Sequence, residues 1–340
     1  MYRAGLGGKV TVCGCDKRPF WVGIRATLRL TFSNVIACPP PQVGGVGLLL
    51  NHEPTLMFQK AGMLAPAGRC RTLDDAADGY VRSEACGALV LGAYSADAGR
   101  GAPQPLAILT GSAVNQDGRS SALTAPNGPA QQEAIRTALA AAGAAPGALT
   151  SLELHGTGTP LGDPCEAGAL AAVLQPPQPA ITAGATQQQQ PCPGAVALHA
   201  AKSKVGHAEA ASGLSGLVHA AVALSSARLL PISHLTAVNP HVVAALEQGR
   251  DAMGRAASGA WALPRQAAGH VFAPRGDGGA ALMTGVSAFA FQGTNAHAVL
   301  RSVSQPGQCS ADTEASMQWR RQRFWPAPAT TGLLSQVQPR

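Results

Sequence analysis

The sequence is poor in aromatic residues, in charged residues and in long apolar runs. Of its 340 residues, 4% are aromatic and 13% are charged, whereas 46% are hydrophobic. A core with so few aromatic side chains must be built mostly from Ala, Val and Leu, which suits closely packed helices and sheets. No run approaches the roughly eighteen apolar residues that a membrane-spanning helix needs, so we predict no membrane span.

A concentrated basic surface is also lacking. The net charge of +7 comes from scattered Arg and Lys, with clusters only at Lys17-Arg18 and at residues 320–323. A nucleic-acid-binding protein usually shows a basic patch interleaved with aromatic residues. We therefore predict no nucleic-acid partner.

The cysteine pattern excludes a disulfide framework. Eight cysteines are irregularly placed, so a reducing compartment, the cytoplasm, is the expected location. Residues 1–42 are basic and hold a single acidic residue, Asp16, which makes an organelle the alternative location. Cys13-Gly14-Cys15 has no second ligand pair at zinc spacing, so we predict no metal site.

Several stretches predict regular structure. The apolar runs at residues 43–50 and 84–91 have the length of strands, and Asn127-Gly128-Pro129 predicts the start of an alanine-rich helix that ends near Ala142. Residues 175–197 are rich in Gln and Pro, and this composition predicts a low-complexity surface insert that contributes little to the core.

The first stretch with chemical character is residues 155–166. An alternating run ends at Leu154, so His155 is expected where a strand gives way to a glycine-rich loop. Asp163, the proline after it and Glu166 have the pattern of a helix start with a capping box. A lone histidine at a strand end is more often structural than catalytic, and the glycine spacing is one residue too long for a dinucleotide fingerprint. The stretch by itself leaves both interpretations open.

A second histidine lies in residues 201–217. His207 comes immediately before a helix of small residues, where the helix N-terminus favours a neutral imidazole. Lys202 could supply a fixed positive charge, although an exposed lysine is the alternative. Gly213 and Gly216 predict that this helix packs closely against a neighbour.

The third stretch, residues 285–300, places two strand-like runs around Gly293-Thr294-Asn295. Such a hairpin could present backbone N–H groups to a developing oxyanion, although its apolar members are expected to pack.

These stretches together resemble a known family. The motifs, in chain order, are CRTLDDAADGYVRSEACG, GSAVNQDGRSSALTAPNGPAQ, HGTGTPLGDPCEAGAL, AKSKVGHAEAASG and GVSAFAFQGTNAHAVL. They closely resemble the β-ketoacyl synthase (ketosynthase) domain of type I polyketide synthases. The resemblance implies an α/β fold, the layered thiolase-like α/β/α/β/α fold, with its first half largely missing.

The resemblance also implies a domain organisation. Residues 1–42 form an unmatched basic leader, residues 43–302 the ketosynthase-like domain and residues 303–340 a C-terminal linker or tail. Surfaces that a missing first half would cover predict low solubility or dependence on a partner.

The implied function is that of an acyltransferase of polyketide or fatty acid biosynthesis. The family joins an acyl thioester to a malonyl-type extender by decarboxylative Claisen condensation. The resemblance implies catalytic roles for His155, His207 and Lys202, with both imidazoles in one pocket. It further implies substrate-binding roles for the gating residue Phe291 and for Thr157, Thr159 and Asn295.

The nucleophilic cysteine of the family has no clear counterpart. The region upstream of residue 43 contains Cys13 and Cys15 but no Ala-Cys-Ser-Ser-type elbow. We therefore expect no competent acyl-accepting cysteine, with Cys15 or Cys13 as the remaining alternative. The competing interpretation is a catalytically inactive remnant that binds acyl chains, a carrier protein or another subunit.

Partners and cofactors follow from the same resemblance. We expect acyl carrier protein as a partner and a homodimer or a partner subunit. No cofactor is expected beyond the phosphopantetheine arm that carries the substrate.

Overall fold

The computed structural model describes most of the region that carries the motifs. It describes the backbone of residues 11–12 and, in full, residues 42–92, 94, 105–119, 125–174, 195–228, 230–247, 261–264 and 281–303. The chain divides into a larger unit, Met1–Gln308, and a smaller unit, Cys309–Arg340. Almost all of the predicted leader, residues 175–194 of the insert and the tail from residue 304 lie outside the described residues.

A mixed sheet of six strands forms the centre of the larger unit. Its order is β4 (Ile108–Gln116), β9 (Thr294–Arg301), β8 (Met283–Phe289), β5 (Ser151–Glu153), β6 (Val196–His199) and β7 (Trp261–Ala262). The first three strands are antiparallel, and β8, β5, β6 and β7 run parallel. Because β6 begins at Val196, the predicted insert is two residues too long.

A second, antiparallel sheet holds three strands. Its order is β1 (Thr11–Val12), β2 (Gln42–Gly47) and β3 (Ala85–Val90), with Val43 opposite Leu89. β3 coincides closely with the predicted run at residues 84–91, whereas β2 ends three residues before the predicted run at residues 43–50 does.

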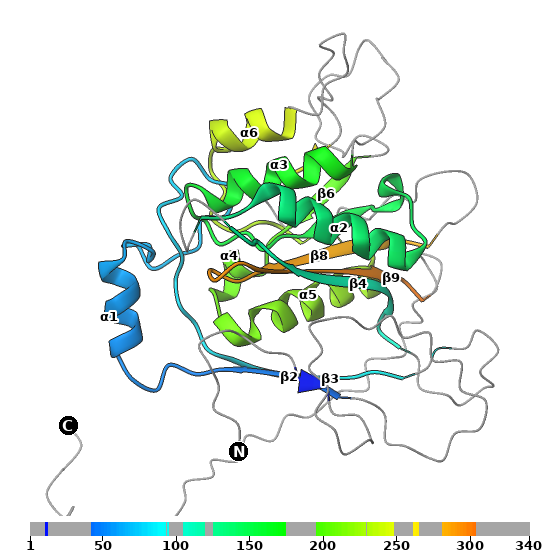
Figure 1. Cartoon of the computed structure of the whole chain (residues 1–340), viewed down its shortest axis with the longest axis horizontal. Helices are drawn as coiled ribbons and strands as arrows, with labels where there is room; N and C mark the ends of the chain where they lie inside the picture. Colours follow the sequence, from blue (N-terminus) through cyan, green and yellow to red (C-terminus); the bar gives the residue numbers. More distant parts are fainter. Residues whose placement is uncertain are drawn as a thin grey trace, which may run out of the picture. The chain divides into compact units, whose positions relative to one another are not determined.

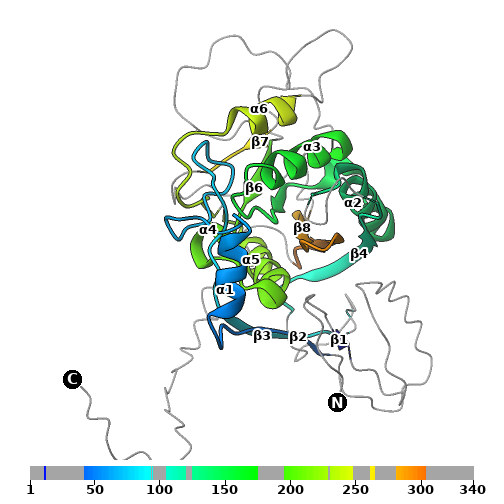
Figure 2. The same cartoon turned by 60° about the vertical axis from the view of Figure 1, so that its left-hand side comes forward.

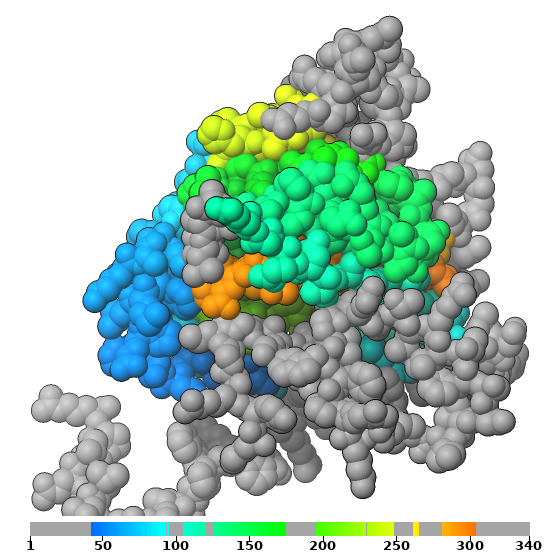
Figure 3. Space-filling view, viewed as in Figure 1, coloured from blue at the N-terminus to red at the C-terminus, as the bar shows by residue number. Residues whose placement is uncertain are grey.

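The helices complete a layered α/β arrangement. Helices α2 (Gly128–Ala142) and α3 (Gly162–Leu174) cover one face of the large sheet, and α5 (Ser212–Ser226) lies between the two sheets (Figures 1 and 2). In the space-filling view, the orange turn end of β8 and β9 shows beside the blue atoms around α1 (Figure 3). The remaining helices are α1 (Glu53–Lys60), α4 (Lys202–Val205), α6 (Pro240–Glu247) and the 3₁₀ turns η1 (Pro146–Ala148) and η2 (Glu209–Ala211).

Small side chains let these layers approach closely, as the composition predicted. A Cβ on Gly111 of β4 would lie 2.4 Å from the carbonyl oxygen of Ala138 in α2. A Cβ on Gly216 of α5 would lie 3.3 Å from Cγ of Glu153. Alanine and leucine fill the buried clusters on both faces of the large sheet. Among the described helices, none is both long and apolar enough to cross a bilayer.

Candidate active site

The structure brings the two predicted histidines together. The ring centroids of His155 and His207 lie 5.5 Å apart with the planes nearly perpendicular, at 89°. His155 follows β5, and His207 precedes η2 and α5. The structure thus places the two imidazoles side by side, although they come from distant parts of the sequence.

Backbone hydrogen bonds orient His155. The N–H of Phe289, at the end of β8, donates to Nδ1 of His155 over 3.1 Å. The backbone N–H groups of His155 and Gly156 donate to the two carboxylate oxygens of Glu166 over 2.8 and 2.9 Å. The loop around the imidazole is thus held by a hairpin on one side and by α3 on the other.

His207 is held in a similar way. The N–H of Glu209 donates to Nδ1 of His207 over 3.2 Å, and the N–H of His207 donates to the carbonyl of Val81 over 2.8 Å. The ring of Tyr80 lies 5.1 Å from the His207 ring, edge to face.

The hydrogen bonds fix the same tautomer on both rings. Because each Nδ1 accepts a backbone N–H, the proton of each neutral imidazole is on Nε2. Burial lowers the pKa of His155 well below its ordinary value, and the charge of Lys202 adds to this effect. Burial, with Lys202 and Arg82, lowers the pKa of His207 to about 3. Near pH 7 the pocket therefore holds two neutral imidazoles, each with an Nε2–H donor.

Lys202 is buried at the start of α4 and is 4% exposed, which removes the alternative of an exposed lysine. Burial lowers the pKa of Lys202, whereas Glu153 and Glu166 act to raise it. The charge of Lys202 acts on both imidazoles and helps to keep them neutral.

The predicted capping box of α3 is wrong. Asp163 accepts the N–H groups of Leu73 and Gly158 over 2.7 and 3.1 Å, and Glu166 binds the histidine loop instead of its own helix. The hydroxyl of Thr159 accepts the N–H of Gly162 over 3.1 Å and takes the capping role. Burial raises the pKa of Asp163 to about 6, against the lowering effect of its N–H donors.

The four residues with expected substrate-binding roles lie in different surroundings. The hydroxyls of Thr157 and Thr159 are 3.5 Å apart in the histidine loop. The Phe291 ring, 37% exposed on the hairpin turn, packs edge to face against Phe58 of α1 at 5.8 Å. Asn295 is 1% exposed and its amide donates to Asp117 over 2.7 Å, so its side chain ties the hairpin to the end of β4.

Three contributors to the site are missed by the sequence patterns. Glu166 has the spacing of a cap, the backbone N–H of Phe289 leaves no sequence signal, and Tyr80 lies in a loop 75 residues before His155. The ring of Phe289 also packs against His155, with ring centroids 5.4 Å apart.

Two of the three cysteines in the described part of the chain have a raised thiol pKa and are therefore held in the thiol form. Burial and the nearby Glu166 raise the pKa of Cys165 in α3 to about 11. Burial also raises the pKa of Cys70, whose sulfur accepts the N–H of Val81 over 3.3 Å. Cys86 is exposed on β3. Cys13 and Cys15 lie outside the described residues. The described residues also hold no group of three metal-ligating side chains.

Two family models match the region that builds this site. The N-terminal domain model of β-ketoacyl synthases matches residues 42–96, and the C-terminal domain model matches residues 106–236. A phenolphthiocerol/phthiocerol polyketide synthase of Mycobacterium tuberculosis is 36% identical over 295 residues, which are 86% of this chain and 14% of that protein. Polyketide synthase ThaG of Burkholderia thailandensis is 39% identical over 264 residues, 78% of this chain and 4% of that protein.

Solved structures agree with these relatives. The ketosynthase from module 6 of the bacillaene synthase of Bacillus subtilis aligns with a TM-score of 0.62 and 31% identity over 77% of this chain and 42% of that chain. The oxazolomycin ketosynthase domain OzmH KS7 of Streptomyces albus aligns with a TM-score of 0.64 and 32% identity over 81% of this chain and 43% of that chain. These neighbours confirm the predicted α/β, thiolase-like fold. The chain spans a small fraction of the synthases it matches, and it belongs to the β-ketoacyl synthase family, as a relative of the ketosynthase domains of type I polyketide synthases.

Proposed function

We propose that this chain carries the extender-activating half of a β-ketoacyl synthase site. One observation carries the proposal: two neutral imidazoles, 5.5 Å apart, whose Nδ1 atoms are occupied by backbone N–H groups and whose protons are therefore on Nε2. Two such donors suit a single oxygen that gains negative charge during a reaction.

The reaction that fits is decarboxylation of a malonyl-type thioester. The thioester oxygen accepts hydrogen bonds from Nε2–H of His155 and His207. As the bond between the α-carbon and the carboxylate breaks, carbon dioxide leaves. The electron pair of the broken bond stays on the substrate, which becomes an enolate. The two donors and the nearby charge of Lys202 stabilise the negative oxygen.

Condensation requires a second substrate. The α-carbon of the enolate attacks an acyl thioester, the new carbon–carbon bond forms, and the thiolate of that thioester leaves. We propose this acyl transfer, in polyketide or fatty acid biosynthesis, as the function of the complete site. The second candidate is a remnant that binds acyl chains, a carrier protein or another subunit without condensing them, and the raised pKa values of Cys70 and Cys165 support it.

Acyl carrier protein is the proposed partner, with its phosphopantetheine arm as the substrate carrier. Thr157, Thr159 and Phe291 are proposed to contact that arm or the acyl chain. A homodimer or a partner subunit, and a cytoplasmic location, remain predictions.

Carbon dioxide release from malonyl-carrier protein tests the proposal. We expect the full chain to decarboxylate this substrate, and His155→Ala or His207→Ala to lower the rate by about 10²-fold or more, because each removes one donor to the enolate oxygen. His241→Ala, at an exposed position of α6, is the matched control and should keep the full rate. Equal rates for all three variants would contradict the proposed role of the pair.

Covalent labelling separates the two candidates for the complete site. Incubation with a labelled acyl thioester followed by peptide mapping should locate an acylated cysteine if the chain condenses. Decarboxylation without any acylated cysteine would favour the remnant.

A further inference from the structure

A buried carboxylate joins the elements that carry the proposed site. Glu153 is 1% exposed at the end of β5, two residues before His155. Its Oε1 accepts the backbone N–H of Ala201 over 2.6 Å, and its Oε2 pairs with Nδ1 of His219 over 2.7 Å. One side chain thus links β5, the turn before α4 and the central helix α5.

The bond to Ala201 sets the position of Lys202. Ala201 is the residue before α4, and its carbonyl accepts the N–H groups of Lys204 and Val205 over 2.9 and 3.0 Å. A helix of four residues has little stability of its own, so its first turn depends on such anchors. Because Glu153 anchors the N–H of Ala201, it also anchors the turn that carries Lys202.

His219 completes the arrangement from α5. Its Nε2 lies 3.2 Å from Nζ of Lys204. An ammonium group can only donate, so this Nε2 accepts and the proton of His219 is on Nδ1, facing Glu153. His219 therefore has the opposite tautomer to His155 and His207, and the chain of donors runs from Lys204 through His219 to Glu153.

The close approach of α5 makes this chain possible. Gly216 lies one turn before His219, and a Cβ at that position would come within 3.3 Å of Cγ of Glu153. The helix can reach the carboxylate because this residue is glycine.

We propose that Glu153 and His219 are positioning residues that hold Lys202 in its place beside the two imidazoles. This inference rests on the proposed decarboxylation. Loss of the His219 donor leaves one oxygen of a buried carboxylate unpaired, so the carboxylate and the turn at Ala201 must rearrange.

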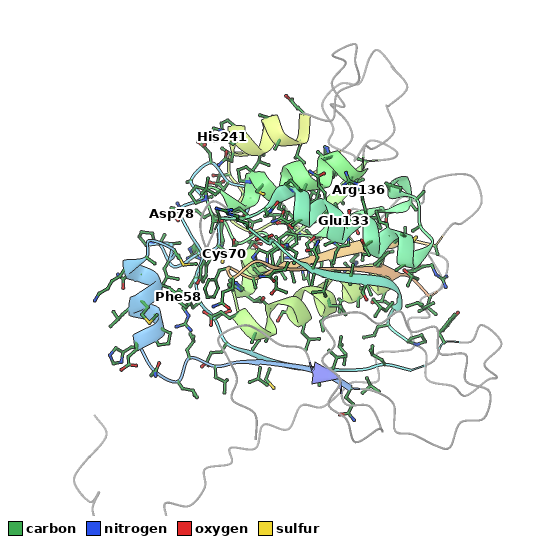
Figure 4. All side chains as sticks on the ribbon, in the orientation of Figure 1. Phe58, Cys70, Asp78, Glu133, Arg136 and His241 are labelled. Carbon is green, nitrogen blue, oxygen red and sulfur yellow. The ribbon has the colours of Figure 1, made fainter. Side chains whose placement is uncertain are left out.

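Two substitutions of His219 separate the contribution of its hydrogen bonds to Glu153 and Lys204 from the contribution of its packing. His219→Leu keeps an apolar volume and removes the donor. His219→Gln keeps an amide that can donate to Glu153 and accept from Lys204. His241→Leu and His241→Gln, on α6, are the matched controls (Figure 4).

The first readout is malonyl-carrier protein decarboxylation by the full chain. We expect His219→Leu to lower kcat about tenfold or more, because Lys202 and the imidazoles are misaligned. KM should stay within about twofold, because substrate binding is unchanged. His219→Gln should recover most of kcat, and both His241 variants should match the wild type. Equal losses in the Leu and Gln variants, or no loss in either, would overturn the proposal.

The second readout does not depend on activity. Amide hydrogen exchange of the Ala201 N–H should be faster in His219→Leu than in the wild type or in His219→Gln. If the wild-type chain releases no carbon dioxide, the proposed function fails, and exchange still decides whether the network holds the turn. Should His219→Leu not fold, Glu153→Gln replaces it, since the amide has one oxygen for two donors and leaves either the Ala201 N–H or the Nδ1–H of His219 without its acceptor; it should show the same loss of kcat and faster exchange. Unchanged exchange at Ala201 in both variants would refute the positioning role.

Discussion

The two sheets of the molecule differ in how far their faces are covered. In the large sheet, β8 packs against α5 and is buried through its centre, and the residues of β5 are all buried. In the small sheet, β2 and β3 alternate between half-buried residues that face α5 and exposed residues on the other face. Val46 and Val90 on that outer face are 53% and 68% exposed.

The composition of the small sheet explains how it packs. Its inner face carries glycines: a Cβ on Gly45 would lie 3.2 Å from Ala211, and one on Gly87 would lie 3.0 Å from Leu214 of α5. Backbone thus packs against the helical layer at Gly45 and Gly87, whereas Val46 and Val90 point away from it. The large sheet can form a core by itself, whereas the small sheet leaves apolar surface that suits a further layer.

The largest expected effect is in the core of the large sheet. Leu152 of β5 is fully buried, and Leu152→Ala should lower the free energy of unfolding by about 2–5 kcal/mol. Val90→Ala, the same kind of truncation on the exposed face, should change it by less than about 0.5 kcal/mol. Chemical denaturation measures both values. Similar losses would mean that the outer face of the small sheet is as well packed as the core.

The second-largest expected effect is a loss of folding stability at low pH, caused by buried histidines in and beside the large sheet. Burial lowers the pKa of His207 to about 3 and the pKa values of His199 and His297 to about 4, all below the ordinary 6.5. The unfolded chain therefore binds protons first as the pH falls below 6.5, and stability declines by about 1.4 kcal/mol per pH unit for each extra proton. Burial raises the pKa of Asp163 to about 6 and that of Glu166 to about 7, so both bind their protons first in the folded state and offset part of this loss.

Denaturation curves at about pH 7 and about pH 5 measure this slope. His297→Leu removes one buried imidazole and should make the slope shallower, whereas the exposed His241→Leu should leave it unchanged. A steeper slope in His297→Leu would contradict the assignment.

A smaller effect is expected where α1 meets the hairpin turn. Phe58 packs against Phe291 at 5.8 Å and against Tyr80 at 6.4 Å. Phe58→Leu should lower stability by about 0.5–1.5 kcal/mol, because it removes these ring contacts and keeps an apolar side chain. Thermal unfolding checks this, with the exposed Met57→Leu on the same helix as the control.

The smallest change in stability, within about 0.5 kcal/mol, is expected for Val46→Thr combined with Val90→Thr. Their effect should instead be on association, because they reduce the exposed apolar surface. Light scattering during concentration should show less aggregation than for the wild type. No change in scattering would mean that the outer face does not drive association.

The sequence predicted the elements better than their long-range contacts. The predicted start of α2 is confirmed, since Asn127 accepts the N–H of Ala130 over 3.2 Å in the expected capping position. The hairpin of β8 and β9 was also expected, although its turn lies at residues 290–293 and not at Gly293-Thr294-Asn295, and so was the close packing at Gly216. These features depend on residues within a few positions of each other, or on the absence of a side chain.

The capping box failed for the opposite reason. Asp163 binds the N–H of Leu73, 90 residues earlier, and Glu166 binds the loop before its own helix. A carboxylate selects among all the donors that the fold brings near it, and a local pattern shows only the nearest ones. The network of Glu153 and His219 escaped the sequence for the same reason.

The hydrogen bonds that set the tautomers of the two imidazoles have an evolutionary consequence. Both donors, at Phe289 and Glu209, belong to the main chain, so almost any replacement of these side chains leaves the proton assignment of the pair intact. Only proline would delete a donor. The position of the proton on each imidazole therefore tolerates mutation of the residues that supply the donors, and the side chains at these two positions can differ between related synthases without moving it.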